Sequence, residues 1–507
     1  MKSLKISLWS LLSLCFFSTM TTVSMYAQET TDIFEAYRQS INKTFEATRV
    51  KHDKTFESYR DSINNAFSEY LRKEWENTSL SESLPNPFKP EPKPVVNTDP
   101  IIESRPLPHI DTPVILEDTI PKPAPLLPIT PPEKTPDIVP NNTPIVKPEL
   151  FVFSFYGIVC QMHLPQPRDL YITNVSPDGI GAAWDILMNE KYDSFMNDCI
   201  RYCSELGLSD WGVYQFTVEL TRKYFGNPDC NEAVLMQMYI LSQMGYKVRL
   251  GMQGNSLINL VAFNELIFSA PYLEIDGDEF YYLSSQAKEG GIQICNYAFP
   301  KETKASLRIA NLPTFPTKAT PVREIKSSAY PSVRISTSVN RNLIDFLNTY
   351  PCCSWELFAG ASLSEEVKEQ IYPSLRNIIR HTDEVTAANV ILNLIQTGFE
   401  YMTDDEQFGR EKTFFGDEPF FYPYCDCEDR SILFSILIRD LLGLDVVLLD
   451  YPSHIATAVR FNTDVPGDYF NLNGEKYIIC DPTYIGAPIG KAMPDMLNIE
   501  ANILRIN

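Results

Sequence analysis

Three side chains near the end of this 507-residue chain could together perform nucleophilic chemistry. They are Cys427, His454 and Asp481, which follow one another at equal intervals of 27 residues. A thiol becomes a strong nucleophile when an imidazole takes its proton, and a carboxylate can hold that imidazole in the required tautomer and stabilise its charged form. These residue types therefore predict a nucleophile, a base and an orienting acid, provided that the fold brings them together.

The segment that follows Cys427 predicts a helix that begins at the cysteine. Apolar residues from Ile432 to Leu441 recur at helical spacing, Asp426 is a suitable N-cap, and Gly443 is placed to end the helix. Cys427 would then lie in the first turn, where unpaired backbone N–H groups favour a thiolate. The next two residues are acidic and oppose this effect. A nearby imidazolium is therefore needed.

Strands after this helix would present the histidine and the acid. The segments 445–450, 454–461 and 476–481 read as strands, and Asn473-Gly474 is a strong hairpin signal. We expect antiparallel neighbours that bring His454 beside Asp481. Two alanines share the face of His454, and we expect them to let the helix approach that face closely.

The order of cysteine, histidine and acid on a helix and two strands resembles the transglutaminase-like superfamily of cysteine enzymes. The matching motifs are D-C-E-D at 426–429, H-I-A-T-A-V at 454–459 and D-P-T-Y at 481–484, and the resemblance covers residues 330–507. It implies a papain-like α+β domain in which a cysteine-bearing helix packs on an antiparallel sheet.

The resemblance also implies roles for the three side chains. Cys427 would attack a carboxamide or peptide carbonyl, His454 would accept and return the proton, and Asp481 would orient the imidazole. The Cys427 backbone N–H would belong to the oxyanion hole, with Gln396 or Tyr424 as a possible second donor. Proteolysis, amide hydrolysis and transamidation all remain open. No calcium loop or cofactor motif is visible, so we expect neither a cofactor nor a metal.

Each of these residues also has an ordinary structural explanation. A cysteine at a helix start is usually a small buried side chain, and an acid before proline often forms a turn. Cys425 and Cys427 are too close for the usual Cys-x-x-Cys zinc motif. A disulfide between Cys425 and Cys480 is another alternative. The competing functional class is a non-catalytic binding or scaffold protein.

An upstream segment repeats the pattern around the cysteine without its catalytic partners. Asp229-Cys230 precedes an apolar helix as Asp426-Cys427 does, and residues 272–283 match 469–480, both at a displacement of 197. Ser284 stands where Asp481 is, and Ser256 or Leu257 stands near the position of His454. We therefore interpret residues 149–320 as a degenerate transglutaminase-like domain and residues 321–507 as the domain with the intact triad.

The N-terminal part predicts export and a helical arm. Residues 1–27 combine Lys2 and Lys5 with a short apolar run, as in a signal peptide, and the mature chain contains no long apolar run. We expect a periplasmic, cell-surface or secreted protein. Residues 28–80 contain an 11-residue repeat over 33–77, which predicts an amphipathic helix for self-association, for docking on a partner, or for packing on its own protein.

Composition limits the remaining possibilities. Residues 85–148 contain 19 of the 38 prolines, so 81–148 is predicted to be an extended linker that cannot build a ladder or a helix. The net charge is −22, and loss of the two signal lysines makes it −24. Such a polyanion is an unlikely partner for nucleic acid. We expect an α+β protein that acts on a protein or peptide substrate.

Overall fold

The computed structural model describes residues 57–87, 95–97, 104–111, 150–165 and 167–506. The described residues divide into two compact units, with the boundary between Ser62 and Ile63. The signal peptide, the first part of the 11-residue repeat and most of the proline-rich segment lie outside the described residues. The described chain is mixed α+β with antiparallel sheets, as predicted. Within these ranges, no helix combines the length and hydropathy required to cross a bilayer.

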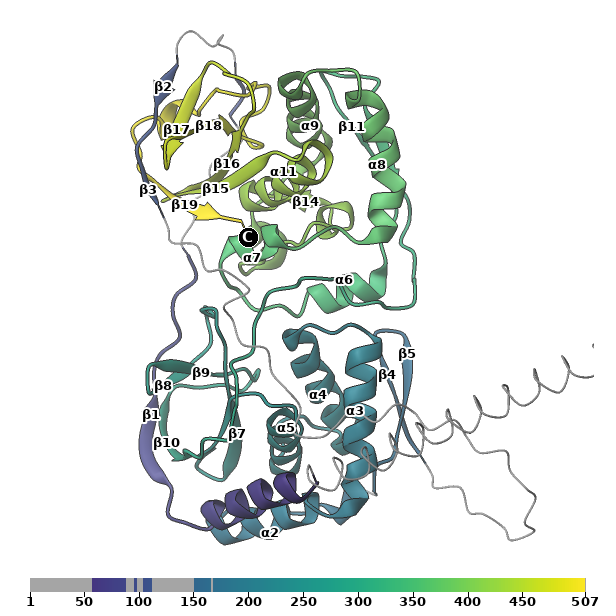
Figure 1. Cartoon of the computed structure of the whole chain (residues 1–507), viewed down its shortest axis with the longest axis vertical. Coiled ribbons are helices and arrows are strands. Elements are labelled where there is room, and N and C mark those ends of the chain that lie inside the picture. Colours follow the sequence, from purple (N-terminus) through teal and green to yellow (C-terminus); the bar gives the residue numbers. More distant parts are fainter. Residues whose placement is uncertain (1–56, 88–94, 98–103, 112–149, 166, 507) are drawn as a thin grey trace, which may run out of the picture. The chain divides into compact units, whose positions relative to one another are not determined.

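The elements of the first half include four helices, the strands of one large sheet and a separate two-stranded sheet. The helices are α2 (Pro177–Leu187), α3 (Asp193–Glu205), α4 (Asp210–Phe225) and α5 (Asn231–Gln243). The strands are β1 (Glu76–Leu80), β4 (Phe151–Phe155), β5 (Ile158–Met162), β6 (Val248–Gln253), β7 (Ser256–Ala262), β8 (Tyr272–Ile275), β9 (Asp278–Tyr282) and β10 (Gly290–Cys295). The large sheet has the order β1-β10-β6-β7-β9-β8, and α5 packs on it (Figure 1). The two-stranded sheet is formed by β4 and β5.

The second half repeats this plan with more helices. Its helices are α6 (Arg341–Leu347), α7 (Trp355–Gly360), α8 (Glu365–Ile379), α9 (Glu384–Gly398), α10 (Asp404–Phe408) and α11 (Cys427–Leu442). Its strands are β11 (Arg323–Lys326), β12 (Arg334–Thr337), β13 (Glu400–Tyr401), β14 (Tyr424–Cys425), β15 (Asp445–Tyr451), β16 (His454–Arg460), β17 (Asp468–Leu472), β18 (Glu475–Cys480) and β19 (Ala501–Arg505). Figure 1 shows α11 lying against β15 and β16.

The two large sheets share one strand order. The first contains β10-β6-β7-β9-β8 and the second contains β19-β15-β16-β18-β17, with antiparallel neighbours throughout both series. In each half, one apolar helix leads directly into the first of four consecutive strands. The sequence repeat is therefore accompanied by a repeat of topology, which a chance similarity of short motifs would not produce.

A short part of the proline-rich segment joins the second sheet at both of its edges. β2 (Arg105–Pro106) pairs with β17, and β3 (His109–Asp111) pairs with β19. Because β2 and β3 are separated by two residues, they close the seven strands into a ring. The prediction that this segment cannot build a ladder is wrong here, because Pro106 lies on an edge strand where its missing N–H is tolerated. The residues on either side of Pro106 donate the hydrogen bonds instead: Arg105 N–H donates to Gly467 O at 3.2 Å, and Leu107 N–H donates to Tyr469 O at 2.7 Å.

The two alanines of β16 face the interior of this ring rather than the helix. Ala456 and Ala458 pack in an apolar cluster with Leu107, whereas Ile455 and Val459 pack in the cluster that contains the apolar residues of α11. Our expectation that the alanines receive the helix is therefore wrong. The small side chains of Ala456 and Ala458 leave room inside the ring for the large aromatic side chains of the same cluster, such as Phe470 and Tyr477.

The helical arm ends before its sequence repeat does. Residues 57–71 are helical, but Glu76 and Asn77 belong to β1, which pairs with β10. The prediction of helix up to residue 77 is therefore wrong at its end. From Ile63 onward the helix packs on its own protein, because Phe67 is fully buried and its ring lies 4.6 Å from that of Trp184. Burial of one aromatic face supports the alternative of intramolecular packing.

Candidate functional site

The helix that carries Cys427 begins as predicted. Asp426 is the N-cap of α11, Cys427 is its first residue, and Gly443 ends it with a φ of +66°. The side chain of Asp429 accepts the backbone N–H of Asp426 at 3.3 Å, which is one half of a capping box. This local chemistry keeps the Cys427 sulfur at the positive end of the helix, where negative charge is stabilised.

The two strands bring His454 and Asp481 together. Asn473 and Gly474 both have positive φ and form the predicted tight turn before β18. β18 lies antiparallel beside β16, with Thr457 opposite Cys480, so Asp481 emerges next to the start of β16. Nε2 of His454 lies 2.9 Å from Oδ2 of Asp481. The predicted contact between these two residues is therefore confirmed.

The surroundings of His454 favour its charged form. Complete burial alone would lower the pKa of the imidazole, but the charge and hydrogen bond of Asp481, followed by those of Cys427, outweigh this effect and raise the pKa to about 10. Nε2–H then donates to Asp481, and Nδ1 is the ring nitrogen left for the thiol. The third predicted residue thus lies within interaction distance of the imidazole.

The thiol of Cys427 is closed off in this conformation. Only 2% of its surface is exposed, and the sulfur donates a hydrogen bond to Oε2 of Glu428 at 3.2 Å. Nδ1 of His454 makes no aligned hydrogen bond in the described residues. The thiol proton is therefore directed toward Glu428, while the imidazole stands close by. A molecule from solution could reach the sulfur only if this site opened.

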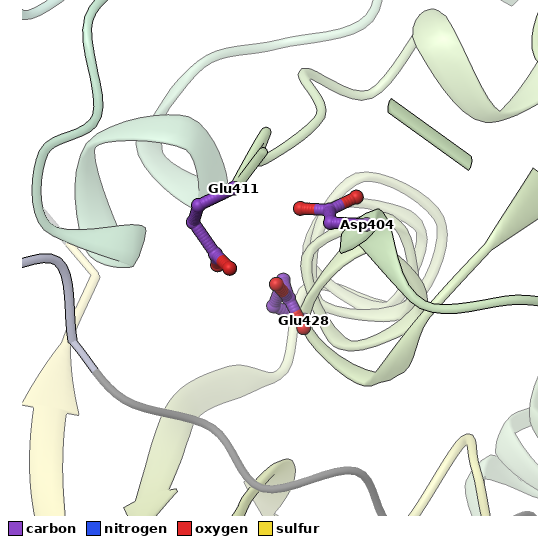
Figure 2. Close-up of side chains that lie close together, drawn as sticks. All are labelled: Asp404, Glu411 and Glu428. Atoms are coloured by element: carbon purple, nitrogen blue, oxygen red, sulfur yellow. The ribbon is translucent and has the colours of Figure 1, made fainter. Parts of the chain in front are cut away.

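Glu428 also belongs to a carboxylate cluster that sequence analysis missed. The carboxylates of Asp404, Glu411 and Glu428 point toward one another, with one oxygen of each within 4.8 Å of the others (Figure 2). Oxygen donors of this kind suit a hard cation such as Ca²⁺, so these residues could hold one. Asp404 and Glu411 lie 24 and 17 residues before Glu428 and form no recognisable motif with it, so motif analysis did not find the cluster.

Two other sequence-based alternatives can be compared with the structure. The amide of Gln396 donates to three backbone carbonyls, those of Asp481, Tyr484 and Ala487, so it is not available as an oxyanion donor. Cys425 and Cys480 are free thiols and form no disulfide. Sγ of Cys425 is directed at the carbonyl oxygen of Glu400, 3.9 Å away.

The upstream copy lacks the partners of its cysteine. Cys230 is the N-cap of α5, and burial raises the pKa of its thiol. Ser256 is the first residue after the hairpin turn between β6 and β7, as His454 is between β15 and β16. Ser284 donates to Asp229 at 2.7 Å. No imidazole thus stands at the position equivalent to His454.

One further aromatic residue shapes the site. The ring of Tyr451 stacks on His454, with centroids 6.4 Å apart and planes 14° from parallel. These residues are paired across the hairpin of β15 and β16, so their contact follows from the turn. Tyr451 thus lies beside the imidazole. A tyrosine directly before a turn gives no sequence signal for this contact.

Comparison of the chain with protein-family models, with curated proteins and with solved structures returns no match.

Proposed function

We propose that this protein is an exported cysteine enzyme with tandem transglutaminase-like domains, in which the second domain acts on amide or peptide bonds of protein substrates. The proposal is carried by one observation. Nε2 of His454 is bonded to buried Asp481, so the other ring nitrogen is left for Cys427 at the tip of α11. The motifs and the repeated strand order support the family assignment.

The reaction would proceed through a thioester. The Cys427 thiolate attacks the substrate carbonyl, and the positive helix end with the Cys427 backbone N–H stabilises the oxyanion that forms. The C–N bond then breaks as the His454 imidazolium donates its proton to the leaving amine. Water or a second amine then attacks the thioester while His454 accepts its proton, the C–S bond breaks, and the Cys427 thiolate is released. Asp481 keeps the ring oriented and compensates its charge in both steps.

The first domain would serve the second without chemistry of its own. Cys230 has neither a base nor an orienting acid, and a cysteine without them is a poor nucleophile. This domain is suited to hold a substrate or to support its neighbour.

Thiol labelling tests the proposal. Iodoacetamide is a small reagent, and labelling near neutral pH is followed by peptide mass spectrometry on the full chain. Cys427 should react at least about tenfold faster than Cys230, although Cys230 is the more exposed of the two. His454→Ala should remove this advantage. Equal, slow labelling of Cys427 and Cys230 in the wild-type protein would support the competing scaffold function.

Trapping the intermediate identifies the chemistry. The protein is incubated with a protein extract from its source, quenched in acid and analysed for an adduct on Cys427 that hydroxylamine removes. The Cys427→Ala variant is the control. An acyl adduct absent from the control is expected, and its mass reports the substrate. Absence of any adduct, together with slow labelling, would refute an acyl-transfer function.

A further inference from the structure

Gln396 lies at the C-terminal end of α9, is 2% exposed, and uses its side-chain amide to hold the loop after β18. The two N–H hydrogens of Nε2 are shared among three carbonyl oxygens of the loop, and Oε1 accepts one backbone N–H. The partners are Asp481 O at 3.0 Å, Tyr484 O at 2.8 Å, Ala487 O at 3.0 Å and Gly486 N at 3.1 Å. One neutral side chain therefore satisfies four backbone groups within seven residues of loop.

This loop fixes the carboxylate of Asp481. Its Oδ1 accepts the backbone N–H groups of Thr483 at 2.8 Å and Tyr484 at 3.1 Å, while Oδ2 faces His454. The direction of the carboxylate therefore depends on the course of the loop backbone. Gln396 holds the same backbone from the opposite side, through the carbonyl of Asp481 itself.

The same end of α9 also holds the helix of the nucleophile. Arg430, on the first turn of α11, donates to the carbonyl oxygens of Gln396 at 3.4 Å and Phe399 at 2.8 Å. Arg430 is 1% exposed, and a buried guanidinium needs such acceptors to offset its lost hydration. Carbonyls at a helix C-terminus are favourable partners for a cation. The end of α9 thus contacts both α11, which carries Cys427, and the acid loop, residues 481–487, which begins with Asp481.

We propose that Gln396 is a positioning residue for the thiol enzyme: it acts through the 481–487 loop to keep the Asp481 carboxylate on His454, and so keeps the imidazole charged beside Cys427. The inference rests on the proposed function of the triad. An amide is suited to this task because it offers both donors and an acceptor without adding a charge that would compete with Asp481. A carboxylate at this position would face three carbonyl oxygens and repel them.

The structure provides a matched control on the same helix. Asn389 lies two turns before Gln396, and its Oδ1 accepts the backbone N–H of Ile489 at 3.0 Å. It thus binds the continuation of the same loop but makes no bond to residues 481–487. Replacing either side chain by leucine removes the side-chain amide, and with it the hydrogen bonds that this amide makes between α9 and this region. The two variants differ in whether the lost contact reaches Asp481.

The experiment compares full-length wild type, Gln396→Leu, Gln396→Met and Asn389→Leu. The rate of Cys427 labelling by iodoacetamide is measured from pH 4 to 10, with circular dichroism as the check on folding. We expect Gln396→Leu to move the pH at which labelling begins upward by about one unit or more, and to slow labelling at neutral pH by about tenfold. Asn389→Leu should stay within about twofold of wild type. Gln396→Met repeats the test if the leucine variant does not fold.

The outcomes separate this inference from the proposed function. A pH profile unchanged in the folded Gln396 variants, while His454→Ala still abolishes fast labelling, would refute positioning by Gln396 and leave the triad intact. Equal losses in the Gln396 and Asn389 variants would assign Gln396 a general role in loop stability and also overturn the inference. A wild-type rate that does not depend on His454 would instead refute the proposed function.

Discussion

Nε2 of His454 lies 2.9 Å from Oδ2 of Asp481, and both side chains are sealed from solvent. Because water does not reach these two groups, each charge is stabilised mainly by the other. Removing one partner would leave a buried charge unpaired, at a high cost in free energy. The pair therefore links the folding of the second sheet to the protonation of one imidazole.

This linkage predicts a loss of stability in mild alkali. The pKa of His454 is raised from 6.5 to about 10 in the folded protein, so the folded state keeps its proton at pH values where the unfolded chain has lost it. The stabilisation is complete below pH 6.5, declines as pH rises, and is lost above about 10. It amounts to on the order of 5 kcal/mol, at about 1.4 kcal/mol for each pH unit.

Urea denaturation between pH 6.5 and 9 measures this effect. The reference is the His454→Gln, Asp481→Asn double variant, which carries neither charge. The difference in unfolding free energy between wild type and reference should shrink steadily with pH. A difference that stays constant over this range would show that His454 is neutral in the folded protein.

Asp481→Asn should weaken the nucleophile without unfolding the protein. The amide keeps the size of the side chain and can still accept the N–H groups of Thr483 and Tyr484, but it no longer compensates the imidazolium. We expect Cys427 labelling at neutral pH to fall by about tenfold to a hundredfold. Asp445→Asn, on β15 of the same sheet, is the control and should label like wild type. Equal rates in both variants would exclude an orienting role for Asp481.

Glu428→Gln should have the opposite effect. The carboxylate accepts the Cys427 thiol proton at 3.2 Å and adds negative charge beside the sulfur, which disfavours the thiolate. Removing the charge should speed labelling at neutral pH by about threefold to tenfold. Glu411→Gln removes a charge from the same carboxylate cluster without a hydrogen bond to the thiol, and its effect should be smaller. Slower labelling in Glu428→Gln would instead identify Glu428 as the base that accepts the thiol proton.

Leu107→Ala should destabilise the second sheet although it changes a residue of the proline-rich segment. Leu107 is 5% exposed and packs in the interior of the strand ring. We expect a loss of about 2–5 kcal/mol in unfolding free energy. Ile110→Ala, in the adjacent β3, alters a residue that is 52% exposed and should cost less than about 0.5 kcal/mol. Similar small losses in both variants would show that residues 105–111 are dispensable for the sheet.

Local signals in the sequence determined the elements that carry the chemistry. The N-cap at Asp426, the helix end at Gly443 and the turn at Asn473-Gly474 all lie where they were predicted, because each depends on the backbone preferences of a few adjacent residues. The turn at Asn473-Gly474 sets the register of β17 and β18, but the pairing of β18 with β16, which places Asp481 beside His454, is a contact between strands that are not joined by this turn.

Tertiary structure alone decided what surrounds those elements. The ring closed by residues 105–111 and the loop held by Gln396 each join segments that are remote in the chain, and the carboxylates gathered beside Cys427 come from three separate segments. Such contacts follow from how layers pack and how buried polar groups find partners, and no local pattern encodes them. The buried Gln396 in an apolar helix was a visible signal that a polar partner was needed, but its partner on the acid loop was set by the fold.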